Sequence, residues 1–287
     1  MRDKLLNDIK RIAVVGAGTM GSGIAQLCAQ AGFETIIFDL VENSAARGKE
    51  IINSNLSIAV DKHKISKDEK DKILSRLKVS AEFIELKADL IIEAIVEDLS
   101  VKSKLFIDLS MINDGNTIFC TNTSSIPITK IAESIPHPER IAGMHFFNPA
   151  HLMMLVEIIS GEKTSPKIIN TVFELAKKLG KVPVKVKDSP GFIVNRIGKL
   201  YHTEPLKILE DNMASIETID RLLESTGFKM GPFKLIDLIG VDSNLNVTKS
   251  LYDLFDHHPK FKPSNLQKLL VDSRFLGKKT GRGFYRY

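Results

Sequence analysis

The chain has 287 residues, of which 43% are hydrophobic and 26% are charged, and its formal net charge at pH 7 is +5. These proportions are those of an ordinary globular protein, and the length is enough for two domains with their own cores. The basic residues are scattered along the chain, and with no tryptophan and 4 tyrosines they are not interleaved with aromatic residues. We therefore expect no nucleic-acid partner.

Targeting signals and membrane spans are not expected. The first eight residues lack the apolar core of a secretory signal, and no apolar run approaches the length that crosses a bilayer. The two cysteines, Cys28 and Cys120, lie in apolar stretches, which favours buried free thiols in a reducing compartment. These features predict a cytoplasmic protein with no membrane partner. No metal site is expected.

The first element is a strand over residues 12–15 that leads through a glycine-rich turn into a helix. Gly16 allows a tight turn, Gly18 lets the backbone approach a pyrophosphate, and Gly21 lets the helix pack closely on the strand. The amides at the start of the helix can then hold phosphate groups. The alternative is a packing turn that binds no ligand.

A second strand, over residues 34–38, is followed directly by Asp39. A carboxylate about 20 residues beyond the glycines can accept hydrogen bonds from the ribose hydroxyls of NAD, and it would repel the additional phosphate of NADP. The sequence therefore predicts a dinucleotide-binding domain that uses NAD.

Strands and helices then alternate along the chain. Apolar spacing predicts a helical hairpin over 44–60 and 67–76, which interrupts the nucleotide-binding pattern. Alternation of this kind favours a Rossmann-type, doubly wound and mostly parallel sheet. The further strands are expected at 77–80, 88–94, 117–120, 140–146, 154–159 and 182–186, and further helices at 101–109 and 165–179.

Strand patterns disappear after the sequence Ser189-Pro190-Gly191, and helical spacing replaces them. Ser215 is expected to cap one helix and Pro232 to begin another. We therefore expect a nucleotide-binding domain over 1–188 and an all-helical domain over 189–287. Pro205 conflicts with this pattern, and it predicts a kink or a break just before it.

Three polar residues stand at or near predicted strand ends, where open α/β sheets bind ligands: Ser124, His145 and Glu157. Taken alone, His145 could be a hydrogen-bonded core residue, and Glu157 could face water at a sheet edge. Because a carboxylate flanked by apolar residues is costly to bury unpaired, Glu157 is expected to have a partner, and an imidazole is the natural one. Such a pair would act as a general base near a nicotinamide, while Ser124 and Asn195 could hydrogen-bond the substrate oxygen.

Several motifs together resemble the short-chain L-3-hydroxyacyl-CoA dehydrogenases, which include bacterial 3-hydroxybutyryl-CoA dehydrogenase, over nearly the whole chain. The matching stretches are 15–21, 93–97, 122–125, 145–149, 155–157, 188–196 and 279–285. The resemblance implies that His145 is the catalytic acid and base, that Glu157 orients it, and that Ser124 and Asn195 contact the substrate oxygen.

The same resemblance implies a cofactor site, a CoA site and a homodimer. In the family, the helical hairpin holds the CoA end of the substrate, and Lys62 falls where a CoA-binding lysine is usual. The helical domain is expected to complete the cleft and to form the dimer. The residues assigned to NAD by this resemblance are Gly16, Gly18, Thr19, Met20, Gly21, Asp39, Ala94, Ile95, Glu97, Lys102, Asn122 and Asn148.

The chain departs from the family pattern at a few positions. Asp98 replaces a usual asparagine, His151 a common proline, Met154 a usual lysine and Pro205 a common alanine. Because Met154 lies close to Glu157 in sequence, it leaves the acyl-chain preference open. A further difference lies in the segment 227–232.

The resemblance implies NAD-linked interconversion of L-3-hydroxyacyl-CoA and 3-oxoacyl-CoA, with short acyl chains, as in fatty-acid or butanoate metabolism. One alternative is a related sugar-acid oxidoreductase resembling L-gulonate 3-dehydrogenase. The other is a non-catalytic nucleotide-binding protein.

Overall fold

The structure is a computed structural model and describes residues 6–287. Residues 1–5, which belong to the expected N-terminal domain and to the stretch in which no targeting signal is expected, lie outside the described residues. The chain forms two compact units, which divide between Ser189 and Pro190.

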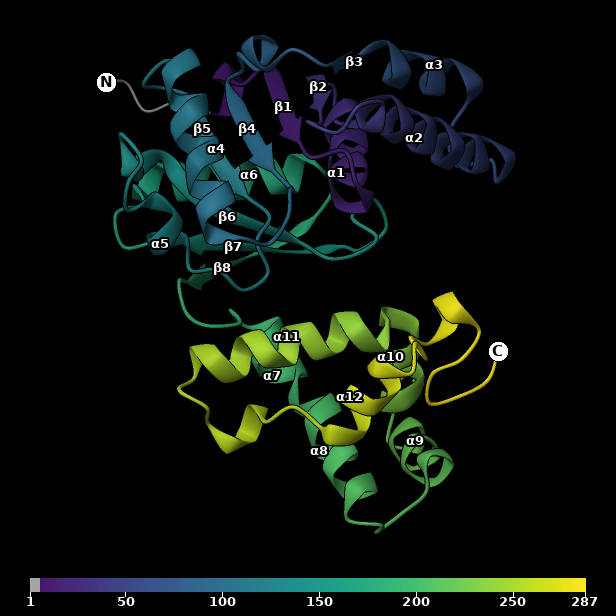
Figure 1. Ribbon diagram of the computed structural model, residues 1–287. Helices are drawn as coiled ribbons and strands as arrows, with labels where there is room; N and C mark the ends of the chain where they lie inside the picture. The colour runs from purple at the N-terminus through teal and green to yellow at the C-terminus, as the bar shows by residue number, and fades with distance from the viewer. Residues whose placement is uncertain (1–5) are drawn as a thin grey trace. The chain divides into compact units, whose positions relative to one another are not determined.

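The first unit is built on one eight-stranded sheet with the strand order β3-β2-β1-β4-β5-β6-β7-β8 (Figure 1). Every neighbouring pair is parallel except β6 and β7, which are antiparallel. This order confirms the prediction of a doubly wound, mostly parallel sheet. The strands are β1 (Arg11–Val15), β2 (Glu34–Phe38), β3 (Leu77–Ser80), β4 (Leu90–Glu93), β5 (Ile118–Thr121), β6 (Ile141–Phe146), β7 (Leu155–Ser160) and β8 (Val182–Lys187).

Helices cover both faces of this sheet, and successive strand residues pack on opposite sides. Ile118 and Cys120 belong to the core cluster shared with helices α1, α2 and α6. Phe119 packs instead against Phe106 of α4, with the two ring centroids 5.5 Å apart. Helix α5, which the sequence pattern missed, is a single short turn. The helices of this unit are α1 (Thr19–Gln30), α2 (Ser44–Asp61), α3 (Lys67–Ser75), α4 (Leu99–Ile112), α5 (Ile128–Ala132) and α6 (Pro166–Lys178), with 3₁₀ turns at Leu6–Asp8, Phe83–Glu85 and Pro138–Arg140.

The predicted helical hairpin is formed by α2 and α3. Ser66 begins α3 with a capping box, in which its hydroxyl accepts from the Glu69 amide and the Glu69 carboxylate accepts from the Ser66 amide. Lys62 follows the last residue of α2 and is exposed at the turn of the hairpin. Asn55 of α2 donates its side-chain amide to Gln26 of α1, which ties the hairpin to the nucleotide-binding helix.

The second unit is helical throughout its named elements (Figure 1). The Ser215 hydroxyl accepts from the Thr218 amide and caps α9, and Pro232 is the first residue of α10, as the sequence predicts. The helices are α7 (Val194–Gly198), α8 (Leu200–Glu210), α9 (Ile216–Ser225), α10 (Pro232–Ile239), α11 (Val241–Leu254) and α12 (Asn265–Asp272), with 3₁₀ turns at Pro259–Phe261 and Lys278–Thr280.

Pro205 lies inside α8, and the helix does not end before it. The break expected just before Pro205 is therefore wrong; the interruption comes earlier, at Lys199 between α7 and α8. The proline side chain is buried, so its packing offsets the hydrogen bond that its missing N–H removes.

Two buried carboxylates hold the C-terminal segment of the second unit. Asp237 accepts from the amides of Phe284 and Tyr285, and the Tyr285 hydroxyl donates to Asp220. Asp220 also accepts from the Phe233 amide at the start of α10. The tail that carries the Gly-Phe-Tyr sequence is therefore fastened to two helices of the same unit.

None of the helices within residues 6–287 combines the length and the apolar character needed to cross a membrane. Cys28 and Cys120 are free and buried in the core of the first unit, and burial raises the pKa of the Cys28 thiol to about 12.

Candidate active site

The turn between β1 and α1 is closely packed on its inner side and open at Gly18. Gly16 has a φ of +99°, which favours glycine, and a Cβ there would overlap the carbonyl of Ala94. A Cβ on Gly21 would overlap the Gly16 carbonyl, so the helix packs against the turn itself. A Cβ on Gly18 would meet nothing within 4 Å. The turn therefore leaves room for a pyrophosphate at the helix start.

Asp39 joins the end of β2 to this turn. Its Oδ2 accepts from the Ala17 amide at 2.8 Å, and its Oδ1 accepts from the Val41 amide at 2.9 Å. The carboxylate is therefore fixed at the carboxyl edge of the sheet, beside the turn. A dinucleotide with free ribose hydroxyls suits this position better than one with an additional phosphate.

Replacing Asp39 by serine is expected to reduce the preference for NADH over NADPH by about 10-fold or more, because the charge that opposes the phosphate is lost. The measurement is the ratio of kcat/KM for the two cofactors. Glu42→Gln, which neutralises an exposed carboxylate three residues along, is the matched control. An unchanged ratio in the Asp39 variant would show that this carboxylate does not select the cofactor.

A cavity of about 1150 Å³ adjoins Asp39 and the turn. Its walls are mostly apolar, which suits the face of an adenine ring, and both Gly16 and Gly18 border it. The residues present therefore fit a dinucleotide. Other lining residues include Leu40, Val41, Phe83, Val96 and Val101.

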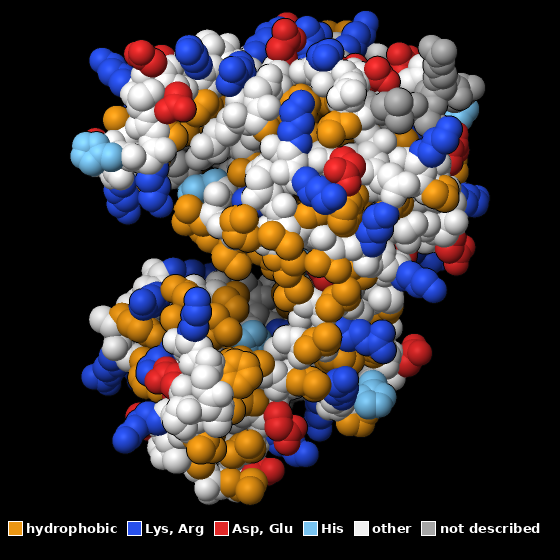
Figure 2. Space-filling view, turned by 180° about the vertical axis from the view of Figure 1, so that it is seen from behind, with side chains coloured by type: hydrophobic (Ala, Val, Ile, Leu, Met, Phe, Trp, Pro, Cys, Tyr) orange, Lys and Arg blue, Asp and Glu red, His pale blue; other side chains and the backbone are white. Residues whose placement is uncertain are grey.

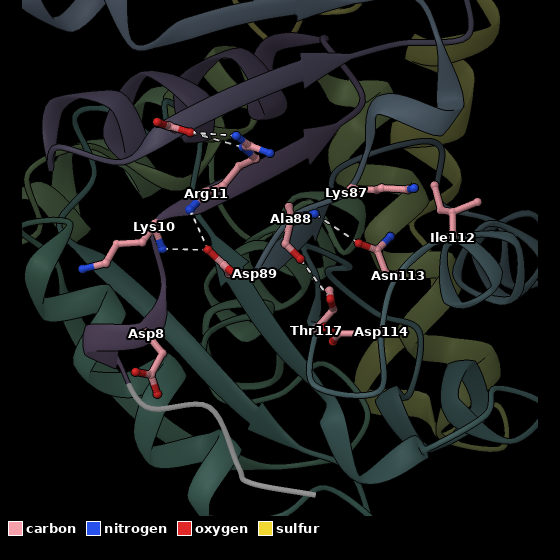
Figure 3. A pocket seen from close by; sticks show the side chains of 11 residues that line it. Asp8, Lys10, Arg11, Lys87, Ala88, Asp89, Ile112, Asn113, Asp114 and Thr117 are labelled. Atoms are coloured by element: carbon pink, nitrogen blue, oxygen red, sulfur yellow. Dashed lines mark hydrogen bonds and ion pairs between the residues drawn. The ribbon is translucent and has the colours of Figure 1, made fainter.

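A second cavity, of about 570 Å³, lies among residues at or just before the starts of β1, β2, β4 and β5 (Figure 3). Asp89 accepts from the amides of Lys10 and Arg11, and Asn113 accepts from the Ala88 amide. These hydrogen bonds join the segments at the starts of the strands, so the polar side chains stabilise the sheet. In open α/β folds the ligand crevice lies at the opposite edge, beyond the carboxyl ends of the strands.

His145 and Glu157 face each other across the antiparallel pair of β6 and β7. The two residues are register partners, and Nδ1 of His145 lies 2.7 Å from Oε2 of Glu157. Their side chains are 7% and 1% exposed, respectively. The Phe147 ring lies beside the imidazole, with the centroids 4.5 Å apart. The carboxylate therefore accepts from Nδ1 and directs the other ring nitrogen away from itself.

Ser124 belongs to a second polar group, which is organised by Glu97. Oε1 of Glu97 accepts from the Thr123 hydroxyl at 2.6 Å and from the Ser124 amide and hydroxyl at 2.8 and 3.2 Å. Its Oε2 pairs with Lys102 at 3.3 Å. Burial raises the pKa of Glu97, but the Lys102 charge and these hydrogen bonds outweigh burial, so the pKa lies below its ordinary value.

Lys102 and Glu93 form a buried ion pair behind this group. The side chain of Lys102 is 1% exposed and that of Glu93 is fully buried. Glu93 also accepts from the Thr121 hydroxyl at 2.6 Å and from the Ile95 amide at 2.7 Å. Sequence reasoning missed Glu93, although an acid that ends the run Leu90-Ile91-Ile92 was a sign that it would need a buried partner.

The remaining predicted residues lie on several elements. Asn122 accepts from the Phe146 amide at 2.9 Å and so links the ends of β5 and β6. Asn148 is exposed on the connection between β6 and β7. Asn195 lies in α7 of the helical unit, partly buried. Asp98 caps α4 by accepting from the Val101 amide, a role that asparagine and aspartate fill about equally well.

Within residues 6–287, no group of three or more His, Cys, Asp or Glu side chains could hold a metal ion.

Comparison with family models and relatives covers both units. The model described as the 3-hydroxyacyl-CoA dehydrogenase NAD binding domain matches residues 11–189, and that of the C-terminal domain matches residues 191–287. A 3-hydroxybutyryl-CoA dehydrogenase of Clostridioides difficile is 42% identical over 96% of this chain and 99% of its own length. The mitochondrial hydroxyacyl-coenzyme A dehydrogenase of Sus scrofa is 39% identical over 97% of this chain and 91% of its own.

A longer relative and a solved structure agree with these matches. The 3-hydroxyadipyl-CoA dehydrogenase of Escherichia coli is 41% identical over 98% of this chain, which spans 60% of that relative's length. The crystal structure of (S)-3-hydroxybutyryl-CoA dehydrogenase from Ralstonia eutropha is 40% identical, covers 97% of this chain and 99% of its own, and has a TM-score of 0.93. This chain therefore belongs to the 3-hydroxyacyl-CoA dehydrogenase family.

Proposed function

We propose that this protein interconverts L-3-hydroxyacyl-CoA and 3-oxoacyl-CoA with NAD as its cofactor. The observation that carries the proposal is the buried 2.7 Å contact between His145 and Glu157 at the same sheet edge as the dinucleotide turn. A histidine held by a carboxylate is suited to move the proton of a secondary alcohol. The names of the relatives support the same reaction.

In the oxidation, His145 takes the proton from the substrate hydroxyl, and the Glu157 carboxylate stabilises the imidazolium that forms. NAD supplies the hydride acceptor. Ser124 and Asn195 hydrogen-bond the substrate oxygen as its charge develops. Glu97 accepts from the Ser124 amide, which keeps that residue at the sheet edge. The single hydroxyl proton of Ser124, which points to Glu97 in this structure, turns to the substrate oxygen when it stabilises the charge there. In the reverse direction His145 donates the proton.

Cofactor contacts are assigned to the turn and to the strand ends. Lys102 is almost fully buried between Glu93 and Glu97, so its role toward the nucleotide is to hold Glu97 in place. The proposed NAD-binding residues are Gly16, Gly18, Thr19, Met20, Gly21, Asp39, Ala94, Ile95, Glu97, Lys102, Asn122 and Asn148.

The CoA end of the substrate is assigned to the α2–α3 hairpin, where Lys62 would pair with a phosphate. Two further exposed lysines, Lys64 and Lys67, lie nearby, together with the exposed acids Asp61 and Asp68. A short acyl chain is the preferred substrate. The relatives do not favour the sugar-acid alternative, and a complete set of Ser124, His145, Glu157 and Asn195 opposes the non-catalytic one.

We also propose a nucleotide-binding domain over 1–188, a helical substrate and dimerisation domain over 189–287, a homodimer and a cytoplasmic location. Large apolar side chains exposed on the helical unit support an interface between two copies (Figure 2). The buried free thiols of the first unit suit a reducing compartment. Sedimentation equilibrium tests the dimer. The exposed apolar residues of the helical unit include Ile197, Leu222, Phe228, Leu238 and Leu269.

The function is tested by measuring NADH oxidation with acetoacetyl-CoA, beside NADPH, a longer 3-oxoacyl-CoA, and L-gulonate with NAD. We expect turnover with acetoacetyl-CoA and NADH and no turnover of L-gulonate. Activity on L-gulonate alone would move the protein to the sugar-acid oxidoreductases. Tight NADH binding without turnover of any substrate would instead support the non-catalytic alternative.

A further inference from the structure

The connection between β6 and β7, residues 147–154, lies between the two strands that carry His145 and Glu157. The last paired residues of the two strands are Phe146 and Val156. Asn148, a proposed cofactor contact, lies on this connection. The geometry of the connection therefore bears on the nucleotide and on the proton-transfer pair at once.

One buried lysine fastens this connection to the start of β8. Nζ of Lys181 donates to the carbonyl of Ala150 at 2.7 Å and to that of Met153 at 2.8 Å. The Lys181 residue is 6% exposed. Next to it, the Val182 amide donates to the Met154 carbonyl at 2.8 Å. One ammonium group therefore satisfies two backbone acceptors of the connection.

Burying the charged ammonium group of Lys181 carries a desolvation cost. Within residues 6–287, no carboxylate forms an ion pair with Lys181, and burial lowers the pKa of its ammonium group. Burial and then the charge of Lys181 lower the pKa of His151 on the connection. An apolar side chain would avoid this desolvation but would remove this donor from both carbonyls, of which that of Ala150 is in a buried hydrogen bond.

Helix α1 touches the same connection. A Cβ built on Gly23 would lie 3.0 Å from the Cβ of Ala150 and 3.5 Å from the His151 amide nitrogen. Ala150 itself is 1% exposed. The helix that begins at the dinucleotide turn therefore packs directly on the segment that Lys181 holds, and a Cβ at Gly23 would require Ala150 to shift by a few tenths of an ångström.

We propose that Lys181 is a positioning residue of the active site: its ammonium group fixes residues 147–154 so that Asn148 and the β6–β7 pair keep their places relative to the dinucleotide turn. This inference rests on the proposed function. Because the CoA end of the substrate is assigned to the α2–α3 hairpin, we expect the loss of Lys181 to lower turnover and to raise the KM for NADH more than the KM for the acyl-CoA.

The test compares Lys181→Met with Lys181→Arg and with the control Lys185→Met, all in the full chain. Lys185 lies four residues further along the chain, exposed on β8. For Lys181→Met we expect kcat to fall roughly 10- to 100-fold and the KM for NADH to rise, since a small misplacement of reacting groups is enough for such a loss. The guanidinium of Lys181→Arg can donate to both carbonyls and is expected to restore most of the activity.

Circular dichroism and thermal unfolding establish that each variant is folded at the assay temperature. The proposal is overturned if folded Lys181→Met keeps the kcat and both KM values of the parent enzyme, or if the KM for acetoacetyl-CoA rises as much as that for NADH. Should Lys181→Met fail to fold, Gly23→Ala replaces it in the test, because a Cβ at this position of α1 displaces the same connection. This variant must then raise the KM for NADH more than the KM for acetoacetyl-CoA.

Failure of the proposed function gives a different pattern. In that case the parent enzyme itself turns over no 3-oxoacyl-CoA, and NADH binding, followed by the fluorescence of the reduced nicotinamide, replaces the kinetic readout. Weaker NADH binding by Lys181→Met than by Lys185→Met still supports the positioning role, whereas equal binding overturns it.

Discussion

Replacing His145 by glutamine is expected to lower kcat for acetoacetyl-CoA reduction by about 10²- to 10⁴-fold, the range that a positioned general acid contributes. The glutamine amide can still donate to Glu157, so the buried carboxylate keeps a partner and the fold is preserved. The amide does not ionise in the accessible pH range, so it cannot transfer a proton to the substrate oxygen. Steady-state kinetics with NADH and acetoacetyl-CoA measure the loss.

His137→Gln is the matched control, because His137 is an exposed histidine of the same unit that contacts Glu139. The control is expected to keep the parent kcat, and His145→Gln is expected to keep the parent affinity for NADH. A kcat within a few-fold of the parent value in folded His145→Gln would show that this imidazole does not transfer the proton.

The second large effect concerns the stability of the helical unit, where Lys199 is buried without an ion pair among residues 6–287. Its Nζ donates to the Asn244 carbonyl at 3.0 Å. Burial lowers the pKa of Lys199 from 10.5 to about 7, and burial and then the charge of Lys199 lower the pKa of His202 from 6.5 to about 3. Lys199→Met is expected to stabilise this unit by roughly 2–4 kcal/mol near and below pH 7.

The direction of this pH dependence follows from how many protons the folded and the unfolded chains bind. Between about pH 7 and 10.5 the unfolded chain holds a proton on Lys199 that the folded chain does not, so stability rises with pH across this window. The free-energy cost of burying the charged Lys199 ammonium group is fully present below pH 7 and is absent above pH 10.5. His202 acts in the same sense between about pH 3 and 6.5. The free energy of unfolding of Lys199→Met is therefore expected to rise much less above neutral pH than that of the parent protein.

Urea unfolding followed by circular dichroism at pH 6.5 and pH 9.5 measures both effects. Lys207→Met, on an exposed position of α8, the helix that begins directly after Lys199, is the control and is expected to change neither value. An unfolding midpoint of Lys199→Met that equals the parent midpoint at both pH values would contradict a buried and uncompensated charge.

Much of the fold could be predicted from local sequence, because the signals are local. The strand over 34–38, the hairpin helices and the Ser215 cap depend on apolar spacing and on capping residues within a few positions. The contact between His145 and Glu157 was also predicted, since a carboxylate in an apolar strand needs a partner.

What could not be predicted depends on pairing between distant segments. The antiparallel direction of β7, the buried Glu93–Lys102 pair and the contact of Lys181 with two carbonyls arise only when the sheet is assembled. Pro205 is a case in which the local sequence predicts a break that does not occur. The proline lies inside α8, where its ring is buried.

The register between β6 and β7 has a consequence for how this enzyme would regain activity after denaturation. His145 lies opposite Glu157, and the neighbours of Glu157 are Val156 and Ile158. A slip of one residue would place an apolar side chain opposite the imidazole and turn the carboxylate to the other face of the sheet. Catalysis therefore reports the correct alignment of these two strands, and a misaligned chain could retain the nucleotide-binding turn while remaining inactive.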